Sequence, residues 1–313
     1  MKSDHPDVPV AIIIYNRPIH TQTLINSLRL QRPKKVYVIA DGPKIESELD
    51  KDLVGKSRAA LKGIDWPCDI QEIFADSNLG LRARVLSGLD VVFENEEKAI
   101  ILEDDCIPDA TFFKYCKELL VRYEFVKSVG IISGHNAATF ANSGNSYFFS
   151  SFTPIWGWAT WGRTWREFRK ADQVEKWSKN EIADVLSTFT TRFFRKQFSK
   201  MMLEAEKLNT WDISFAVFLR QKRFVNAIPS VSLISNIGFG QESTHTKFKP
   251  FDIEIQSGRL TFPLKHPEGV SEDPNYEPTL YRKKLSSWLS YPVLHPVEFL
   301  RRMLKFLTLR LRG

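Results

Sequence analysis

Hydrophobic residues in the first half of the chain occur either in short continuous runs or at helical spacing. The run Val10–Tyr15 is typical of a strand that is buried on both faces of a sheet. Further strands are predicted at 35–40, 69–74, 98–102 and 129–133. Helices between them are predicted at 21–30, 46–61, 81–92 and 112–123. This alternation predicts an α/β fold with a mostly parallel central sheet flanked by helices.

The second half of the chain has a different pattern. An aromatic-rich stretch covers 147–168 and a charged helical region covers 180–208. A helix is predicted at 212–222 and a strand at 231–235, and irregular loops are expected from there to about residue 281. The sequence contains no internal repeat, so we expect a single domain over 1–281 followed by a tail over 282–313.

The amino-acid composition excludes several classes of protein. The chain has 313 residues, 43% of them hydrophobic, which excludes a disordered or collagen-like protein. Its three cysteines, Cys68, Cys106 and Cys116, have no metal-ligand spacing and are too few to cross-link a fold of this size. The apolar run near the N-terminus is far too short for a signal peptide or a membrane span. We therefore expect reduced thiols and a cytoplasmic location.

The net charge of +7 is concentrated in the tail. Residues 282–313 contain eight Lys and Arg against one acid, Glu298, so the remaining chain is neutral. A neutral body argues against nucleic-acid binding, which needs a basic face. Over 297–312 the basic side chains gather on one helical arc and the apolar ones opposite, except for Arg310, which breaks the pattern. This pattern predicts an amphipathic tail on an anionic membrane surface, with a terminal helix packed on the body as the alternative.

Polar side chains follow four of the predicted strands at their carboxyl ends, where α/β sheets bind ligands. They are Asn16 and Arg17, then Asp41, then Asn78 and Gly80, and finally Glu103, Asp104 and Asp105. Three consecutive acids crowd negative charge, which Mn²⁺ or Mg²⁺ bound together with a diphosphate would relieve. The alternative is that the acids only favour the start of the next helix.

These residues carry a resemblance to a known family. The segment ILEDD, followed by Pro108-Asp109 and FFKY, resembles the metal-binding acidic motif of GT-A glycosyltransferases. It is most similar to the N-acetylglucosaminyltransferase I type and to family 2-like bacterial transferases. The resemblance covers about residues 8–250 and implies a GT-A fold with a nucleotide-binding half (8–135) and an acceptor-side half (136–250).

The resemblance also implies roles for the strand-end residues. Asp105 would ligate the metal, while Glu103 and Asp104 would lie near the ribose and metal-bound waters. Asp41 would lie near the base and Arg17 near the diphosphate, with Asn16, Asn78 and Gly80 completing the nucleotide site. Arg84 would serve the phosphate or the base, since Arg suits phosphate; the alternative is an exposed residue on a surface helix.

A catalytic base is expected from another segment. In the related enzymes a Trp-Asp pair before an apolar helix supplies it, and Trp211-Asp212 occupies the same place here. Inverting sugar transfer requires a carboxylate that accepts the proton of the attacking hydroxyl. The alternative is that Asp212 only caps the helix, a position that Asp favours.

A loop and an aromatic wall complete the prediction. Residues 236–246 contain two glycines and suit a mobile loop over the nucleotide, in which His245 would contact the metal or the diphosphate, or else simply be exposed. Trp156 and Trp158, on either side of Gly157, are expected to face a cleft and stack on sugar together with Trp211, whereas Trp161 and Trp165 are expected in the core. A further polar strand end, 133–136, is a possible sugar contact.

The leading hypothesis is a metal-dependent, inverting glycosyltransferase that uses a nucleotide-diphosphate sugar, with a UDP-sugar favoured. Its acceptor would be a glycan or lipid-linked molecule in cell-surface polysaccharide synthesis, at the inner face of the membrane. One alternative is a nucleotidyltransferase, which usually needs a Gly-rich phosphate loop that YNRPIHT lacks. The other is a catalytically inactive carbohydrate-binding scaffold.

Overall fold

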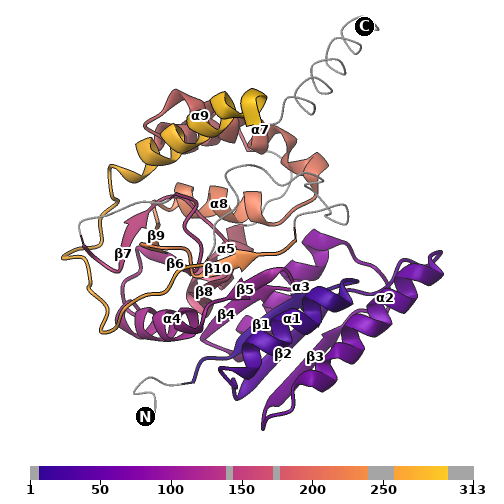
Figure 1. The fold of residues 1–313 in the computed structure, drawn as a ribbon. Coiled ribbons are helices and arrows are strands. Elements are labelled where there is room, and N and C mark those ends of the chain that lie inside the picture. The colour runs from indigo at the N-terminus through magenta and orange to yellow at the C-terminus, as the bar shows by residue number, and fades with distance from the viewer. Residues whose placement is uncertain (1–6, 139–143, 172–176, 239–256, 295–313) are drawn as a thin grey trace, which may run out of the picture.

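A sheet of eight strands forms the centre of the molecule. The computed structural model describes residues 7–138, 144–171, 177–238 and 257–294. The strands are β1 (Val10–Ile14), β2 (Lys35–Ala40), β3 (Asp69–Phe74), β4 (Lys98–Glu103), β6 (Val129–Ser133), β7 (Tyr147–Ser150), β8 (Trp158–Trp161) and β9 (Val225–Pro229). Their order in the sheet is β3-β2-β1-β4-β8-β6-β9-β7 (Figure 1).

One half of this sheet is parallel, as the sequence predicts. Strand β1 pairs in parallel with β2 and with β4, and β2 pairs in parallel with β3. Every residue of β1 is buried, which is why this strand is a continuous apolar run. The predicted bounds of β2 and β3 agree with the structure residue for residue.

The other half makes the sheet mixed, so the prediction of a mostly parallel sheet is wrong. Strand β8 runs antiparallel to both β4 and β6, and β7 runs antiparallel to β9, while β6 and β9 are parallel. A parallel neighbour needs a long crossover, usually a helix. The aromatic-rich stretch supplies the strands β7 and β8 without a helix between them. Periodicity alone carries no information on strand direction.

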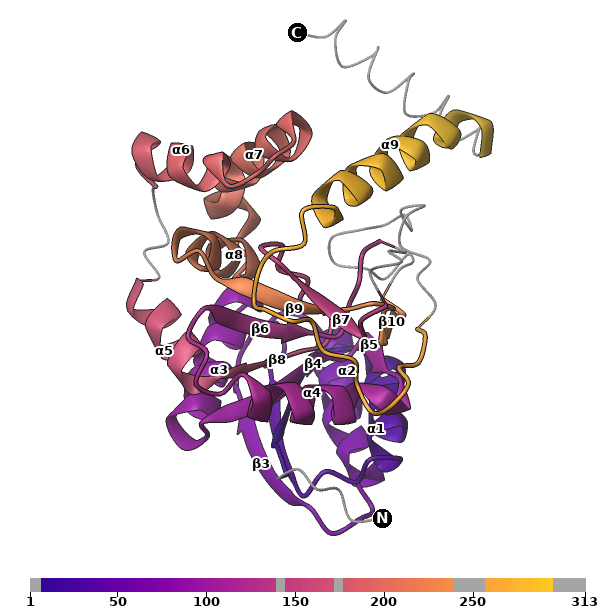
Figure 2. The same ribbon diagram turned by 90° about the vertical axis from the view of Figure 1, so that its left-hand side faces the viewer.

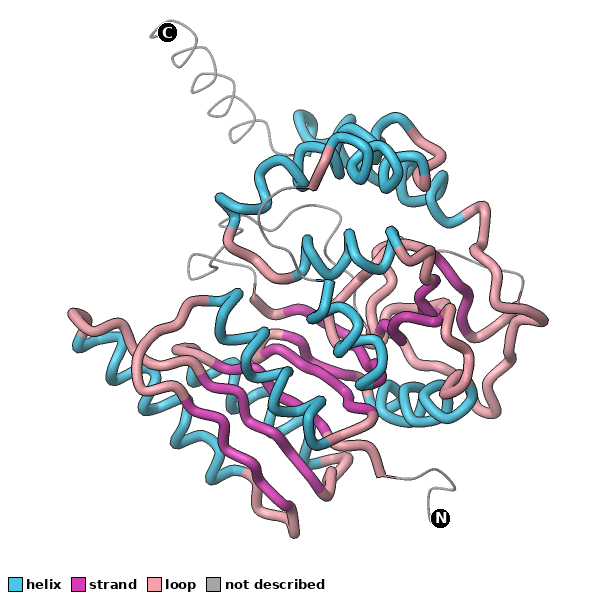
Figure 3. The backbone as a smooth tube through the Cα atoms, turned by 180° about the vertical axis from the view of Figure 1, so that it is seen from behind, coloured by secondary structure: helices cyan, strands magenta, loops and turns pink. Residues whose placement is uncertain are grey.

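Helices cover both faces of the sheet (Figure 3). On one face, α1 (Pro18–Arg29) and α4 (Ala110–Arg122) pack on the strands, with α2 (Glu48–Ala59) and the short 3₁₀ helix η1 (Ala60–Gly63) beside α1. On the other, α3 (Leu81–Asn95), α5 (Gly162–Ala171) and α8 (Asp212–Gln221) share a second core with the strands. The four helices predicted in the first half are therefore confirmed.

A further set of helices lies beyond α8. Helices α6 (Lys179–Ser187) and α7 (Arg192–Leu208) pack against α8, and α9 (Tyr276–Leu294) begins beside β7 (Figures 1 and 2). The irregular loops expected up to about residue 281 are present over the described residues 257–275 but end earlier, because α9 starts at Tyr276, whose ring is fully buried. The boundary expected at residue 282 consequently falls inside a helix.

A small two-stranded ribbon lies beyond the carboxyl end of β4. It pairs β5 (Cys106–Pro108) in antiparallel orientation with β10 (Ile234–Asn236). The strand expected at 231–235 is thus present but begins at Ile234. Because β5 directly follows the acidic triplet, the ribbon brings the segment after β10 to the acids. Among the described residues, no helix is long and apolar enough to cross a membrane.

Candidate active site

The acidic triplet lies at the carboxyl end of β4, as predicted from its place after an apolar run. Glu103 is the last residue of the strand, aligned with Ile13 of β1. The backbone N–H of Asp104 donates to the carbonyl of Ile13 at 3.0 Å, so the end of β1 holds the turn that carries Asp104 and Asp105. Asp104 is buried, whereas Glu103 and Asp105 are half-buried.

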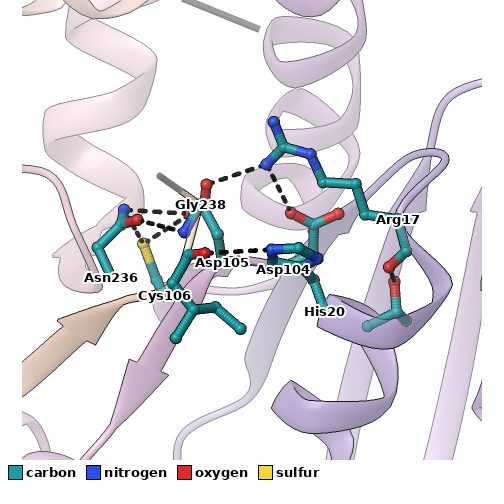
Figure 4. A network of polar contacts seen from close by, with 9 residues as sticks. Arg17, His20, Asp104, Asp105, Cys106, Asn236 and Gly238 are labelled. Carbon is teal, nitrogen blue, oxygen red and sulfur yellow. Dashed lines mark hydrogen bonds and ion pairs between the residues drawn. The ribbon is translucent and has the colours of Figure 1, made fainter. Parts of the chain in front are cut away.

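Arg17 faces two of these acids. It precedes α1, and its Nη1 lies 3.1 Å from Asp105 Oδ2 and 3.6 Å from Asp104 Oδ1 (Figure 4). The Arg17 side chain is only 16% exposed, so these contacts are partly shielded from solvent. The prediction that the ends of β1 and β4 meet in one site is confirmed for Arg17, Asp104 and Asp105.

The pKa values of the acids show an excess of negative charge. Burial is the largest cause that raises the pKa of Glu103 to about 8, followed by the charges of Asp105 and Asp104. Burial and then Asp105 raise the pKa of Asp104 to about 7, although Arg17 opposes the rise. Bringing a cation to this place would favour the ionised carboxylates and lower both values.

The ribbon of β5 and β10 closes over Asp105 from the other side. Asn236 Nδ2 donates to Asp105 Oδ1 at 3.3 Å, and the backbone N–H of Ile237 donates to the Asp105 carbonyl at 2.9 Å (Figure 4). A Cβ atom on Gly238 would lie 2.1 Å from Asp105 Oδ2, so a larger residue there would require the Asp105 side chain to move. His20 of α1 donates from Nε2 to the carbonyl of Ile237 at 3.2 Å.

Asp41 holds the loop that leads into α3. Its Oδ1 accepts from the backbone N–H groups of Gly42 and Leu79 at 2.8 and 2.9 Å. Its Oδ2 accepts from Asn78 Nδ2 and from the backbone N–H of Gly80, both at 3.0 Å. Gly80 has a φ of 82°, a conformation that suits glycine. Asp41 and Asn78 therefore fix the backbone of 78–80, and four donors of this chain already occupy the carboxylate.

Asn16 is held by an acid that the sequence analysis missed. Asp50 of α2 accepts from Asn16 Nδ2 at 2.7 Å, from the Tyr15 hydroxyl at 2.6 Å and from the backbone N–H of Lys44 at 2.7 Å. Asp50 is buried and ties the end of β1 to the loop after β2. No local signal distinguishes it, because Asn16 is 34 residues away in sequence.

Arg84 lies in α3, and the alternative that placed it on an exposed surface is wrong. Only 6% of the residue is exposed, and its buried Nε and Nη2 have no hydrogen-bond partner among the described residues. Burial lowers its pKa, while the negative charge of Asp41 raises it. Burying guanidinium N–H groups without acceptors costs free energy of folding. This side chain could therefore donate hydrogen bonds to an anionic or carbonyl group of a ligand.

Asp212 is the first residue of α8 and not its N-cap. Trp211 holds the cap position, and no side chain caps the helix. The Thr210 hydroxyl donates to Asp212 Oδ1, and the charge of Asp212 contributes to the raised pKa of Glu103. Arg82, which the sequence analysis missed, donates from Nη1 to the Thr210 carbonyl at 3.1 Å and to Ser214 Oγ at 2.9 Å. The start of α8 is thereby attached to the start of α3.

The prediction that Trp158 is a loop residue facing a cleft is wrong. Trp158 is in β8 and 1% exposed, and its ring stacks on that of Trp211 at 5.7 Å. Trp211 is 2% exposed, so neither ring can stack on a sugar in this arrangement. Both pack with α5 and α8, whose apolar faces need large partners on the sheet. Trp161 and Trp165 are buried, as predicted.

Trp156 alone of these four tryptophans in 156–165 is half-buried. Its ring centroid lies 4.4 Å from that of His135. Gly157 has a φ of 58°, and a Cβ there would lie 2.4 Å from Ile234, so glycine lets β8 begin close to β10.

His135, after β6, is a buried histidine that stays neutral. Its Nδ1 lies 3.2 Å from Ser232 Oγ. Burial, with the positive charge of Lys283 as the second cause, lowers the pKa of His135 to about 3 from an ordinary value near 6.5. The neighbouring Ser133 and Asn136 are also buried and bonded to their own chain.

The lowered pKa of His135 predicts that the folded protein loses stability in acid. Between pH 6.5 and about 3 the unfolded chain binds a proton at His135 that the folded chain does not, so the free energy of unfolding falls as pH decreases. The expected slope is about 1.4 kcal/mol per pH unit for one proton. In His135→Asn this contribution disappears, whatever the variant's stability at neutral pH. Urea unfolding at several pH values measures the slope, and equal slopes in both proteins would contradict the prediction.

Two expectations fall on residues that are not described. His245 and the glycine loop beyond residue 238 lie outside the described residues, as does the amphipathic segment 297–312. Nothing in the described parts of the chain bears on them.

The acids at the end of β4 fit a divalent cation of the kind that is shared with a phosphate ligand. Mg²⁺ is usually held by one or two carboxylates together with substrate phosphates. Asp105 offers such a carboxylate, and its negative charge adds to burial in raising the pKa values of Glu103 and Asp104. Within 7–138, 144–171, 177–238 and 257–294, no three Asp, Glu, His or Cys side chains could hold an ion by themselves.

Comparison with known proteins gives only distant similarity. The sequence matches no described family and no curated protein. The mannosyltransferase PcManGT from Pyrobaculum calidifontis, in complex with GDP-Man and Mn²⁺, is 10% identical, with a TM-score of 0.36 over 70% of this chain and 69% of that one. UDP-glucose pyrophosphorylase complexed with UDP-glucose is 8% identical, with a TM-score of 0.24 over 46% and 62%. The 4-diphosphocytidyl-2C-methyl-D-erythritol synthase from Anaerococcus prevotii is 9% identical, with a TM-score of 0.33 over 64% and 98%.

Proposed function

We propose that this protein is a metal-dependent glycosyltransferase that uses a nucleotide-diphosphate sugar. The observation that carries the proposal is the set of three acids at the end of β4, with Arg17 on one side and Asp212 near enough to raise the pKa of Glu103. A diphosphate needs cations, which would be Arg17 and an ion held by the acids, and a sugar acceptor needs a base, which would be Asp212. The resemblance of the acidic motif to GT-A enzymes supports the same reaction.

The diphosphate of the donor would lie between Asp105 and Arg17. When bound, Mn²⁺ or Mg²⁺ would supply positive charge that stabilises the departing diphosphate. Arg17 would exchange its contact with Asp105 for a phosphate oxygen, since guanidinium binds both groups with the same geometry. Glu103 and Asp104 would lie near the ribose and the waters of the cation.

The nucleoside would lie over the loop 78–80. Here we revise the role of Asp41: because its oxygens already accept four hydrogen bonds, it would position the loop backbone instead of binding the base. Asn78 and Gly80 belong to the same network, and Asn16 would act through Asp50. Arg84, with two unpaired donors, would be the side chain that reaches the nucleotide.

Asp212 would act as the general base. One of its oxygens accepts from the Thr210 hydroxyl, which leaves the other for the acceptor. As the acceptor oxygen bonds to the anomeric carbon, its proton passes to Asp212 and the bond from that carbon to the diphosphate oxygen breaks. Attack opposite the leaving group inverts the anomeric centre. Trp156 would contact the sugar or the acceptor from the side of β8.

Incubation with Mn²⁺ and a panel of nucleotide sugars tests the proposal. Slow release of nucleoside diphosphate, suppressed by a chelator, is expected, because water replaces the missing acceptor. Formation of pyrophosphate or its consumption would instead identify a nucleotidyltransferase, and no turnover with any donor would favour a carbohydrate-binding scaffold. Once an acceptor is found, the anomeric configuration of the product, read by NMR, tests inversion.

A further inference from the structure

Helix α9 is attached to the body through its first half, where Lys283 Nζ also donates to the carbonyl of Ala137 at 2.9 Å. Tyr276 packs against Phe148 at 4.7 Å between ring centroids, and Leu280 belongs to the same core. Glu277 accepts from the backbone N–H groups of Thr190 and Thr191 at 3.0 and 2.6 Å, at the start of α7. An acid at a helix N-terminus is favoured by the unpaired N–H groups and the helix dipole. These contacts fix the direction in which α9 leaves the body.

The rest of α9 leads away from the body (Figure 2). None of the residues 281–292 is buried. Trp288 is 72% exposed, Leu289 60% and Leu285 39%. A spacing of three and four residues puts these side chains on one face of the helix. A tryptophan and two leucines on a projecting helix are an apolar surface that has no partner among the described residues.

The positive charge near this apolar surface indicates what kind of partner it binds. Residues 281–294 contain Arg282, Lys283 and Lys284 and no acid. Arg282 is three residues before Leu285, so a cation lies on the same side of the helix as the apolar group. Tryptophan is enriched where an apolar layer meets water, and Lys and Arg stems reach from such a layer to negatively charged head groups. An apolar protein groove would not require this excess of positive charge.

We propose that the distal half of α9 binds an anionic lipid surface, with Trp288, Leu289 and Leu285 in the interface and the exposed Arg282 on the head groups. The chain continues from α9 into 295–313, which has five basic residues against one acid. The lipid-binding element thus starts in the described helix and is not confined to the last residues of the sequence. This inference is independent of the proposed reaction.

Sedimentation of the full chain with vesicles tests the inference. The protein is expected to pellet with vesicles of phosphatidylcholine and phosphatidylglycerol and not with phosphatidylcholine alone. Trp288→Ser with Leu289→Ser should weaken the binding by about tenfold or more, because each apolar side chain loses its burial. The control Phe125→Ser removes a side chain that is 91% exposed and outside α9, and it should bind like the unaltered protein.

A second variant tests the charge. Arg282→Gln should also reduce binding, by about fivefold for the loss of one charge, and make it less sensitive to salt. Normal binding by the Trp288 and Leu289 variant would show that 295–313 suffices and would overturn the role of α9. Light scattering without lipid provides the other check: a dimer that is lost on Trp288→Ser would mean that this face binds a second copy of the chain, and would also overturn the proposal.

Discussion

Asp212→Asn is expected to lower the rate of sugar transfer by about 10²–10⁴-fold, the usual effect of removing a general base. Donor affinity should not change, because Asp212 lies at the start of α8 and the proposed diphosphate site is formed by β4 and α1. Asparagine keeps the shape of the side chain and an oxygen that can accept from the Thr210 hydroxyl. Only the charge and the ability to take a proton are lost. Initial rates at saturating donor, with calorimetric donor binding, separate the two effects.

The substitution also distinguishes the base from a structural role. Because Asp212 is in the first turn of α8, its charge favours the helix dipole by only about 0.3–1 kcal/mol. Thermal unfolding should therefore change little. Asp184→Asn, on α6, removes a half-exposed carboxylate that pairs with Arg223 and serves as the control with normal turnover. A near-normal rate in Asp212→Asn would remove this residue from the mechanism.

The second large effect is expected in Asp105→Ala, which should lose the metal-dependent part of nucleoside diphosphate binding. Calorimetry with UDP or GDP, with and without Mn²⁺, measures it. In the presence of Mn²⁺ the unaltered protein gains affinity and the variant does not, because the carboxylate that would share the ion with the phosphates is gone.

Without metal, Asp105→Ala should have the opposite effect on the affinity for nucleoside diphosphate. Asp105 then only repels the diphosphate and occupies Arg17 at 3.1 Å, so the variant should bind at least as tightly as the unaltered protein. Asp65→Ala removes an exposed acid paired with Arg29 and controls for the change in net charge. Equal losses of affinity with and without Mn²⁺ would mean that Asp105 supports the fold and not the ion.

The candidate site shows which of its features local sequence patterns can predict. The three acids, Arg17 and the Asp41 turn were predicted because each follows a buried strand, and parallel strands put such residues at one edge. The contacts that hold them were not predicted. Asp50 lies 34 residues from Asn16, and Arg82 lies 128 residues from Thr210. Nothing in a sequence window indicates such a pair, because the two partners lie on segments that are far apart in the chain.

The tryptophans show a case in which a local sequence pattern gave the wrong environment. A Trp-Gly-Trp segment is typical of a loop that faces a ligand, yet Trp158 lies in β8 against Trp211. Whether an aromatic ring faces solvent or a helix depends on what packs on that side of the sheet. Here α5 and α8 do so, and both come later in the chain.

The sequence by itself determined the alternation of strands and helices in the first half, the position of the acids at a strand end and the basic character of the C-terminal region. These properties depend on periodicity and composition, which are local. Only the tertiary structure decided that the sheet is mixed, that Asp41 supports a loop and that α9 leaves the body with Trp288 exposed. It also decided that Arg84 is buried, with two nitrogens that have no hydrogen-bond partner among the described residues. Each of these depends on strand direction or on contacts between distant segments, which hydrophobic spacing does not encode.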